Sequence, residues 1–110
     1  MIIRLSAALA LLASPGFADE LRVLPGTEGF SWESFEAFAA ATDHSGATVT
    51  LAGPWRGPDA EAAKAVMAYF EAATGAEVIV TGSDSFEQQI RIDAEAGAAP
   101  NLAVFPQPGL

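Results

Sequence analysis

The chain has 110 residues, a formal net charge of -9 and 51% apolar residues. This length accommodates at most one small domain, and the absence of cysteine excludes disulfides, a thiol nucleophile and a thiolate zinc site. The acidic balance disfavours nucleic acid as a partner, because its phosphates would be repelled.

Residues 1–18 have the pattern of a secretory signal peptide. A basic start at Arg4 precedes an apolar run over residues 5–13, and Gly16 and Ala18 place small residues before the expected cleavage point. The apolar run is shorter than the roughly 20 residues that a membrane span requires. We therefore expect cleavage after Ala18 and export to the periplasm. Because no cysteine follows the run, we expect no lipid anchor.

Residues 19–46 form a segment that is predicted to contain one helix. Proline and glycine residues interrupt its first part. Ser31 is a suitable N-cap, and the residues after it have the spacing of a helix over residues 32–42. We expect the aromatic stripe of this helix to be used for packing; it consists of Trp32, Phe35 and Phe38.

Residues 47–52 alternate and are rich in β-branched side chains, which predicts a strand. After a loop that is rigid because of its prolines, the pattern is helical over residues 59–74, and Gly75 is the expected stop. This helix has one apolar stripe, made of Ala63, Val66, Met67, Phe70 and Thr74. The charged residues expected to face away from the stripe are Glu61, Lys64 and Glu71.

A second strand is predicted over residues 76–81 and a third helix after Asp84. Asp84 and Glu87 have the spacing of a capping box, and Glu87 with Arg91 would form a favourable pair one turn apart. The nearly continuous apolar run over residues 101–105 suits a parallel strand that is covered on both faces. The buried face of the third helix is expected to consist of Phe86, Ile90 and Ala94.

The predicted order is one helix followed by β-α-β-α-β. This order implies the α/β class, with a parallel sheet and right-handed crossovers. A sheet of three strands has two bare edges, which normally need further strands or a cover. We therefore expect residues 47–110 to be a partial, truncated α/β lobe, either the front of a longer protein or a unit that a partner completes.

Ligands of open α/β sheets gather at the carboxyl ends of the strands. Three loops meet that condition, over residues 53–57, 82–86 and 105–109. They offer what a neutral polyhydroxyl ligand needs: an aromatic ring for the apolar face of a sugar, and polar groups for its hydroxyls. The ring belongs to Trp55, and the polar groups belong to Arg56, Asp84 and Gln107.

Each of these residues also has a purely structural interpretation. Trp55 could cover the sheet edge, and Arg56 could be a solvated surface charge. Asp84 fits a helix cap better than a ligand contact, although it could do both. Ser83 is an ordinary turn residue, and Gln107 could serve only to shape its turn.

Signals of catalysis are weak. His44 is the single histidine, and no nucleophile stands in a recognisable motif. Residues 53–57 lack the Gly-Lys-Ser/Thr ending of a phosphate-binding loop. The carboxylates are spread over helix surfaces, and no metal-ligand spacing occurs. We expect neither enzymatic activity nor a metal or cofactor.

Four segments carry a resemblance to a known family. They are TVTLAGPW (48–55), AYFEAATG (68–75), SDSFEQQI (83–90) and APNLAVFPQPG (99–109). Together they resemble the N-terminal part of the extracellular solute-binding proteins of sugar ABC transporters, and most of all the alpha-glucoside-binding type. The resemblance covers about residues 30–110, and the signal peptide agrees with it.

The resemblance implies a periplasmic-binding-protein fold, type II-like, with two lobes that close on a sugar and dock on a membrane permease. Residues 1–18 would be the signal peptide, 19–46 the N-terminal segment and 47–110 part of the first lobe. The complete protein would be a monomer several times longer than this chain. Its ligand-binding residues would include Gly53, Trp55, Arg56, Ser83, Asp84, Phe86, Pro106 and Gln107.

Other functions stay open at this point. One is a binder of a different solute, such as an oxyanion held at the helix N-termini. Another is a small exported protein that a partner completes, and a third is a small exported enzyme. The acidic net charge and Trp55 favour a neutral sugar over an oxyanion.

Overall fold

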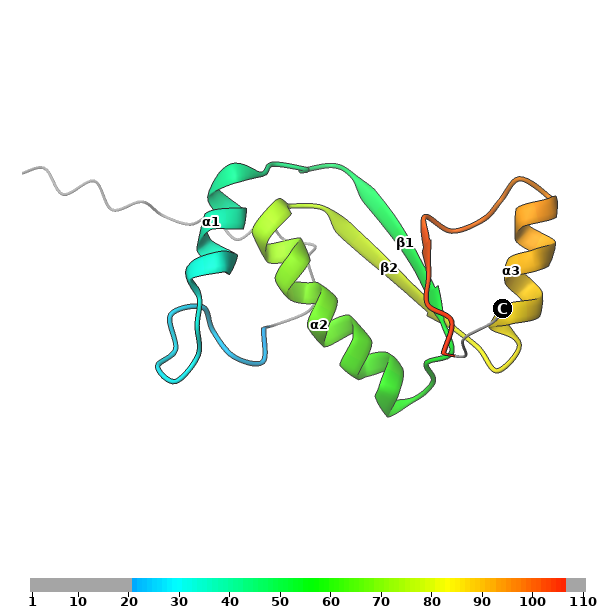
Figure 1. Ribbon diagram of the computed structural model, residues 1–110, viewed down its shortest axis with the longest axis horizontal. Helices are drawn as coiled ribbons and strands as arrows, with labels where there is room; N and C mark the ends of the chain where they lie inside the picture. Colours follow the sequence, from blue (N-terminus) through cyan, green and yellow to red (C-terminus); the bar gives the residue numbers. More distant parts are fainter. Residues whose placement is uncertain (1–20, 107–110) are drawn as a thin grey trace, which may run out of the picture.

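The computed structural model describes residues 21–106, so the predicted signal peptide and Gln107 lie outside the described residues. The described part contains three helices and one parallel sheet with the strand order β2-β1-β3 (Figure 1). The elements are α1 (Glu33–Ala41), β1 (Thr48–Gly53), α2 (Pro58–Thr74), β2 (Glu77–Gly82), α3 (Phe86–Glu95) and β3 (Leu102–Ala103). The α/β class and the order of a helix followed by β-α-β-α-β are confirmed. None of these helices is long and apolar enough to cross a bilayer.

The first strand is the centre of the sheet. β1 pairs with β2 from Thr48↔Glu77 to Gly53↔Gly82, and with β3 at Leu51↔Leu102 and Ala52↔Ala103. Because it is flanked on both sides, β1 buries its last three residues, whereas β2 alternates between exposed and half-buried positions. One buried cluster therefore lies toward the carboxyl end of β1, and a second lies at the end of α2, where Ala68, Ala73, Thr74 and Ala76 are buried.

The two crossover helices lie on opposite faces of the sheet. Right-handed crossovers require this, because β2 and β3 flank β1 on opposite sides. Leu51 points to the α2 side, and its neighbours Thr50 and Ala52 point to the α3 side. Figure 1 shows that α2 lies lengthwise along the sheet and that α3 lies farther from it.

The aromatic stripe of α1 is used for packing, as predicted, and its partner is the last turns of α2. Trp32 and Phe35 contact Tyr69 with ring centroids 6.1 and 6.3 Å apart, and Phe38 lies 6.3 Å from Phe70. The stripe stays shallow, since no residue of α1 is buried. The Tyr69 hydroxyl donates to the Val23 carbonyl (2.8 Å) and accepts from its N–H (2.9 Å), which ties the preceding segment to α2.

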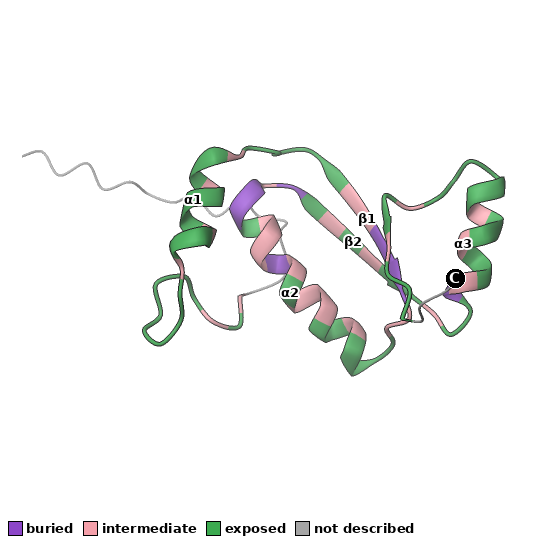
Figure 2. Ribbon diagram, viewed as in Figure 1, coloured by how far each residue is buried: buried purple, intermediate pink, exposed green. Residues whose placement is uncertain are grey.

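The predicted stripe of α2 is only partly right. The buried residues of α2 are Ala68, Ala73 and Thr74, whereas Val66 is 62% exposed. Small side chains let the last turns of α2 approach β2 closely, so burial concentrates there (Figure 2). Glu71 does not face away as predicted, because its carboxylate accepts the Val78 N–H of β2 at 3.0 Å.

Both predicted helix caps are wrong. The N-cap of α1 is Trp32 instead of Ser31, and the N-cap of α3 is Ser85, with no side-chain cap bond at either position. Asp84 pairs with Arg56 instead. The predicted Glu87–Arg91 pair is also absent among residues 21–106, where the ion pairs are Arg56–Asp84 and Lys64–Glu61.

The last strand is shorter than predicted, and its cover on both faces is not found. β3 comprises Leu102 and Ala103 alone, and Leu102, Val104 and Phe105 are 56%, 43% and 43% exposed. The Asn101 side chain explains the late start. Its Oδ1 accepts the Thr50 N–H at 2.9 Å, which takes the place of a backbone ladder bond.

Gly75 ends α2 as predicted, with a left-handed φ of 76° and its N–H donating to the Glu71 carbonyl (2.8 Å). A Cβ at Gly75 would lie 2.6 Å from the Ser45 hydroxyl oxygen. That hydroxyl cannot move freely, because it donates to Asp43 at 2.7 Å. The same bond, together with the Ser45 N–H, lowers the pKa of the Asp43 carboxyl.

We expect Gly75→Ala to lower the free energy of unfolding by about 2 kcal/mol, from backbone strain and the Ser45 contact together. Gly97→Ala is the matched control, since Gly97 has a φ of 73° and nothing within 4 Å of its Cβ position. It should cost only the strain, about 1 kcal/mol. Urea denaturation of both variants measures the difference, and equal losses would contradict the Ser45 contact.

Candidate ligand-binding edge of the sheet

Two glycines end the paired strands β1 and β2 at the same level. Gly53 and Gly82 are register partners, and the loop after Gly53 folds back over both of them. A Cβ on Gly53 would lie 2.6 Å from Cζ3 of the Trp55 indole, and a Cβ on Gly82 would overlap the Trp55 carbonyl oxygen. Glycine at both positions therefore lets the Trp55 loop lie directly on the strand ends.

Sequence reasoning missed this role of Gly82. The signal was present, because both predicted strands end next to a glycine. What the sequence lacked was the register that places Gly82 beneath Trp55.

An ion pair joins the first two predicted loops. Arg56 follows β1 and Asp84 follows β2, and the Arg56 guanidinium donates to the Asp84 carboxylate. The side chains are 60% and 77% exposed, so water screens the pair and its contribution to stability is small, about 0–1 kcal/mol. Its main consequence is positional: the pair links the two loops across the edge of the sheet.

The second and third loops meet through two aromatic rings. Phe86 is 5% exposed, and its ring centroid lies 5.4 Å from that of Phe105, which follows β3. Pro106 continues the third loop at the surface, and Gln107 lies beyond the described residues. The structure thus brings the three predicted loops to one edge, while ligand contact by their residues stays a prediction.

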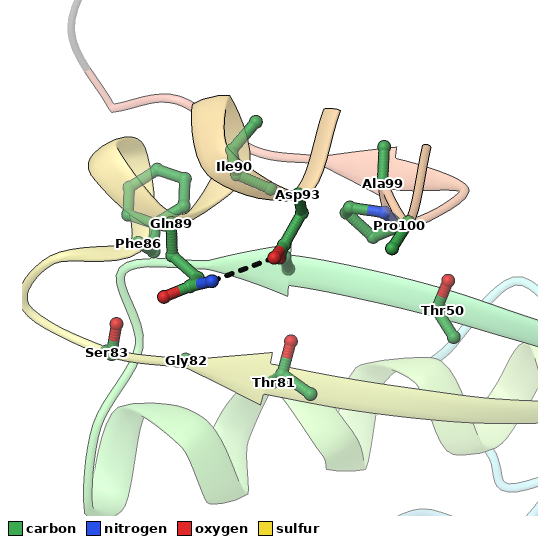
Figure 3. A pocket seen from close by; sticks show the side chains of 12 residues that line it. Thr50, Thr81, Gly82, Ser83, Phe86, Gln89, Ile90, Asp93, Ala99 and Pro100 are labelled. Carbon is green, nitrogen blue, oxygen red and sulfur yellow. Dashed lines mark hydrogen bonds between the residues drawn. The ribbon is translucent and has the colours of Figure 1, made fainter. Parts of the chain in front are cut away.

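A hollow of about 390 Å³ separates the sheet from α3. In Figure 3 the hydroxyls of Thr81 and Ser83 point toward α3, and Gln89 and Asp93 point back toward the strands. The Gln89 side-chain amide donates to Asp93 at 2.8 Å across one turn of the helix. Of the predicted site residues, Ser83 and Phe86 line this hollow.

A second hollow, of about 550 Å³, lies on the opposite face between Leu51 and α2. Trp55 borders this one, and the rest of its lining is mostly apolar. The predicted residues therefore do not share a single cavity. The crossovers explain this, because they send the first loop to one face and the second loop to the other. The shared feature of the loops is the edge itself, where Arg56 and Asp84 meet.

The single histidine of the chain does not lie at this edge. Within residues 21–106, no group of three or more His, Asp or Glu side chains is placed to hold a metal ion. His44 precedes β1 and so lies at the amino end of the sheet, where its backbone N–H donates to the Thr74 carbonyl at 2.7 Å.

Two known proteins are similar to the chain. The alpha-glucosides-binding periplasmic protein AglE of Rhizobium meliloti (strain 1021) is 46% identical over 111 residues, which cover 94% of this chain and 24% of that protein. The osmoprotective compounds-binding protein GgtB of Synechocystis sp. is 44% identical over 62 residues, which cover 56% of this chain and 15% of that protein. No family model and no solved structure matches the chain.

The chain spans about a quarter of the length of AglE, so the similarity concerns only that part of a solute-binding protein. Within that part, almost every residue of the chain is aligned. The resemblance to alpha-glucoside-binding periplasmic proteins that the sequence motifs predicted is therefore confirmed.

Proposed function

We propose that this chain forms one wall of the sugar cleft in the solute-binding component of an ABC transporter for alpha-glucosides. The complete component captures its ligand between two lobes and delivers it to a membrane permease. The observation that carries the proposal is the 46% identity to AglE over 94% of the chain. The meeting of three loops at the carboxyl edge of the sheet supports it, since ligands of open α/β sheets bind there.

The proposal includes the organisation of the chain. Residues 1–18 act as a cleavable signal peptide that exports the protein to the periplasm without a lipid anchor. Residues 19–46 form the N-terminal segment, and residues 47–110 form part of the first lobe. The complete protein is a monomer, and its function is binding, without catalysis. Both relatives are named as binding proteins, which supports the binding function.

At the edge, each residue has a role that suits a sugar. The half-buried Trp55 stacks on the apolar face of a sugar ring, and Gly53 gives the indole room to lie on the strand end. Arg56 and Asp84 supply a donor and an acceptor for ring hydroxyls. Phe86 fixes the third loop through Phe105. Further ligand contacts come from Ser83, Pro106 and Gln107.

GgtB supports a second ligand class. Its name assigns it to osmoprotective compounds, and it matches 56% of this chain at 44% identity. Titration of the full-length protein with maltose, cellobiose and glycine betaine would separate the two classes. Binding of maltose, but not of the β-linked isomer cellobiose, supports the alpha-glucoside proposal. Binding of glycine betaine alone contradicts it.

We expect Trp55→Ala to weaken the binding of maltose by about 1–3 kcal/mol, because a buried aromatic contact with the sugar is lost. Isothermal titration calorimetry of the full-length protein measures this loss. Trp32→Ala is the matched control, since Trp32 packs on Tyr69 of α2 and belongs to none of the three loops. Its affinity should equal that of the wild type. An unchanged affinity in Trp55→Ala would assign Trp55 to packing alone.

A further inference from the structure

The edge where the loops meet carries one cation among several carboxylates. Over residues 53–59 and 82–87 the charged side chains are Arg56, Asp59, Asp84 and Glu87. Arg56 is the single positive group of this set, and its guanidinium is engaged by Asp84. The other two acids stand in the first turns of α2 and α3.

Asp84 is committed to Arg56 rather than to its own helix. It has the sequence spacing of a capping residue, yet the N-cap of α3 is Ser85 and no side-chain cap bond forms there. The hydrogen bond of the Asp84 carboxylate runs to Arg56, 28 residues earlier in the chain. Both side chains remain more than half exposed, so a solute can reach the pair.

We propose that Asp84 is a specificity-determining residue. Its carboxylate occupies the position on Arg56 that an anionic ligand would take, so the edge binds neutral polyhydroxyl ligands and rejects oxyanions. This inference rests on the proposed function, since it concerns which solutes the same site rejects.

The chemistry follows from what a guanidinium recognises. Its planar fork of N–H donors fits a carboxylate, a sulfate or a phosphate in the same two-point manner. Because Asp84 already pairs with the guanidinium, an incoming oxyanion must displace that carboxylate or share the cation with it. A sugar hydroxyl meets no such competition, since it can accept from the free guanidinium N–H groups and donate to the Asp84 carboxylate.

The test is the isosteric variant Asp84→Asn in the full-length protein, titrated with sodium sulfate by calorimetry. The sulfate Kd of Asp84→Asn should be up to about fivefold lower than that of the wild type, because the substitution frees the guanidinium from a pair worth up to about 1 kcal/mol. Sodium chloride should reduce this gain in affinity, because the contact is exposed. The double variant Asp84→Asn/Arg56→Gln should lose it.

Glu61→Gln is the matched control. It removes the carboxylate of the other ion pair, Lys64–Glu61 at 3.3 Å, and changes the net charge by the same amount. It should gain no sulfate binding. The inference is overturned if Asp84→Asn gains no sulfate affinity, or if Glu61→Gln or the double variant gains as much. Titration of the wild type with maltose tests the proposed function separately, because its failure leaves the sulfate comparison intact.

Discussion

Gly82→Ala should destabilise the protein by about 1–3 kcal/mol and displace the loop that carries Trp55 and Arg56. The added Cβ would overlap the Trp55 carbonyl oxygen and lie 2.9 Å from the Trp55 carbonyl carbon. These are backbone atoms, so no change of side-chain rotamer relieves the overlap. Urea denaturation measures the loss of stability. Weaker maltose binding by the full-length variant would report the displaced loop.

Gly53→Ala is the matched control at the register partner of Gly82. The nearest contacts of its Cβ would be with the indole ring of Trp55, at 2.6 Å from Cζ3, and not with the loop backbone. Adding Trp55→Ala should therefore restore much of the stability that Gly53→Ala loses, and none of the loss in Gly82→Ala. If Trp55→Ala rescued Gly82→Ala, the added Cβ of residue 82 would overlap the indole ring of Trp55 and not its backbone, which would contradict the prediction.

The helices and strands that the sequence predicted well are those whose bounds depend on residues close by in the sequence. The first strand was predicted over residues 47–52 and is found at Thr48–Gly53. The second helix ends at Thr74, directly before Gly75. Glycine adopts the left-handed backbone conformation that ends a helix with little strain. The parallel order follows from alternation of strands and helices alone.

The features that could not be predicted depend on contacts between distant segments. Asp84 has the spacing of a cap, but the strand register brings Arg56 within reach and the carboxylate pairs there. Glu71 was predicted to lie on the charged face of its helix, but its carboxylate accepts a hydrogen bond from the Val78 N–H of β2. Asn101 shortens the last strand by bonding to Thr50, 51 residues earlier. No local pattern contains these partners.

The candidate site was predictable as an edge and not as a cavity. Topology alone places the ends of β1, β2 and β3 together, and the Arg56–Asp84 and Phe86–Phe105 contacts show that the loops do meet. The same topology divides the space beside them, with Trp55 on the α2 side and Ser83 on the α3 side. We predict that a ligand that contacts both faces crosses the edge where Arg56 and Asp84 pair.

Phe86→Ala should detach α3 from the sheet. Phe86 is the one buried residue of α3, and its ring joins the start of the helix to Phe105 after β3. Truncating a buried phenylalanine costs about 3–5 kcal/mol in a closed core, and we expect about 2–3 kcal/mol here because Phe86 borders an open hollow. Hydrogen exchange should then accelerate over residues 86–103, while β1 and β2 keep their protection.

Ile92→Ala is the matched control in the same helix. Ile92 is 50% exposed, so its truncation should cost less than about 0.5 kcal/mol and leave the exchange of α3 unchanged. Equal acceleration in both variants would mean that α3 is held by its whole length. Acceleration in Phe86→Ala alone would mean that one aromatic contact holds α3 and the third loop together. In that case the loops of the edge are positioned by two separate links, the Phe86–Phe105 contact and the Arg56–Asp84 pair.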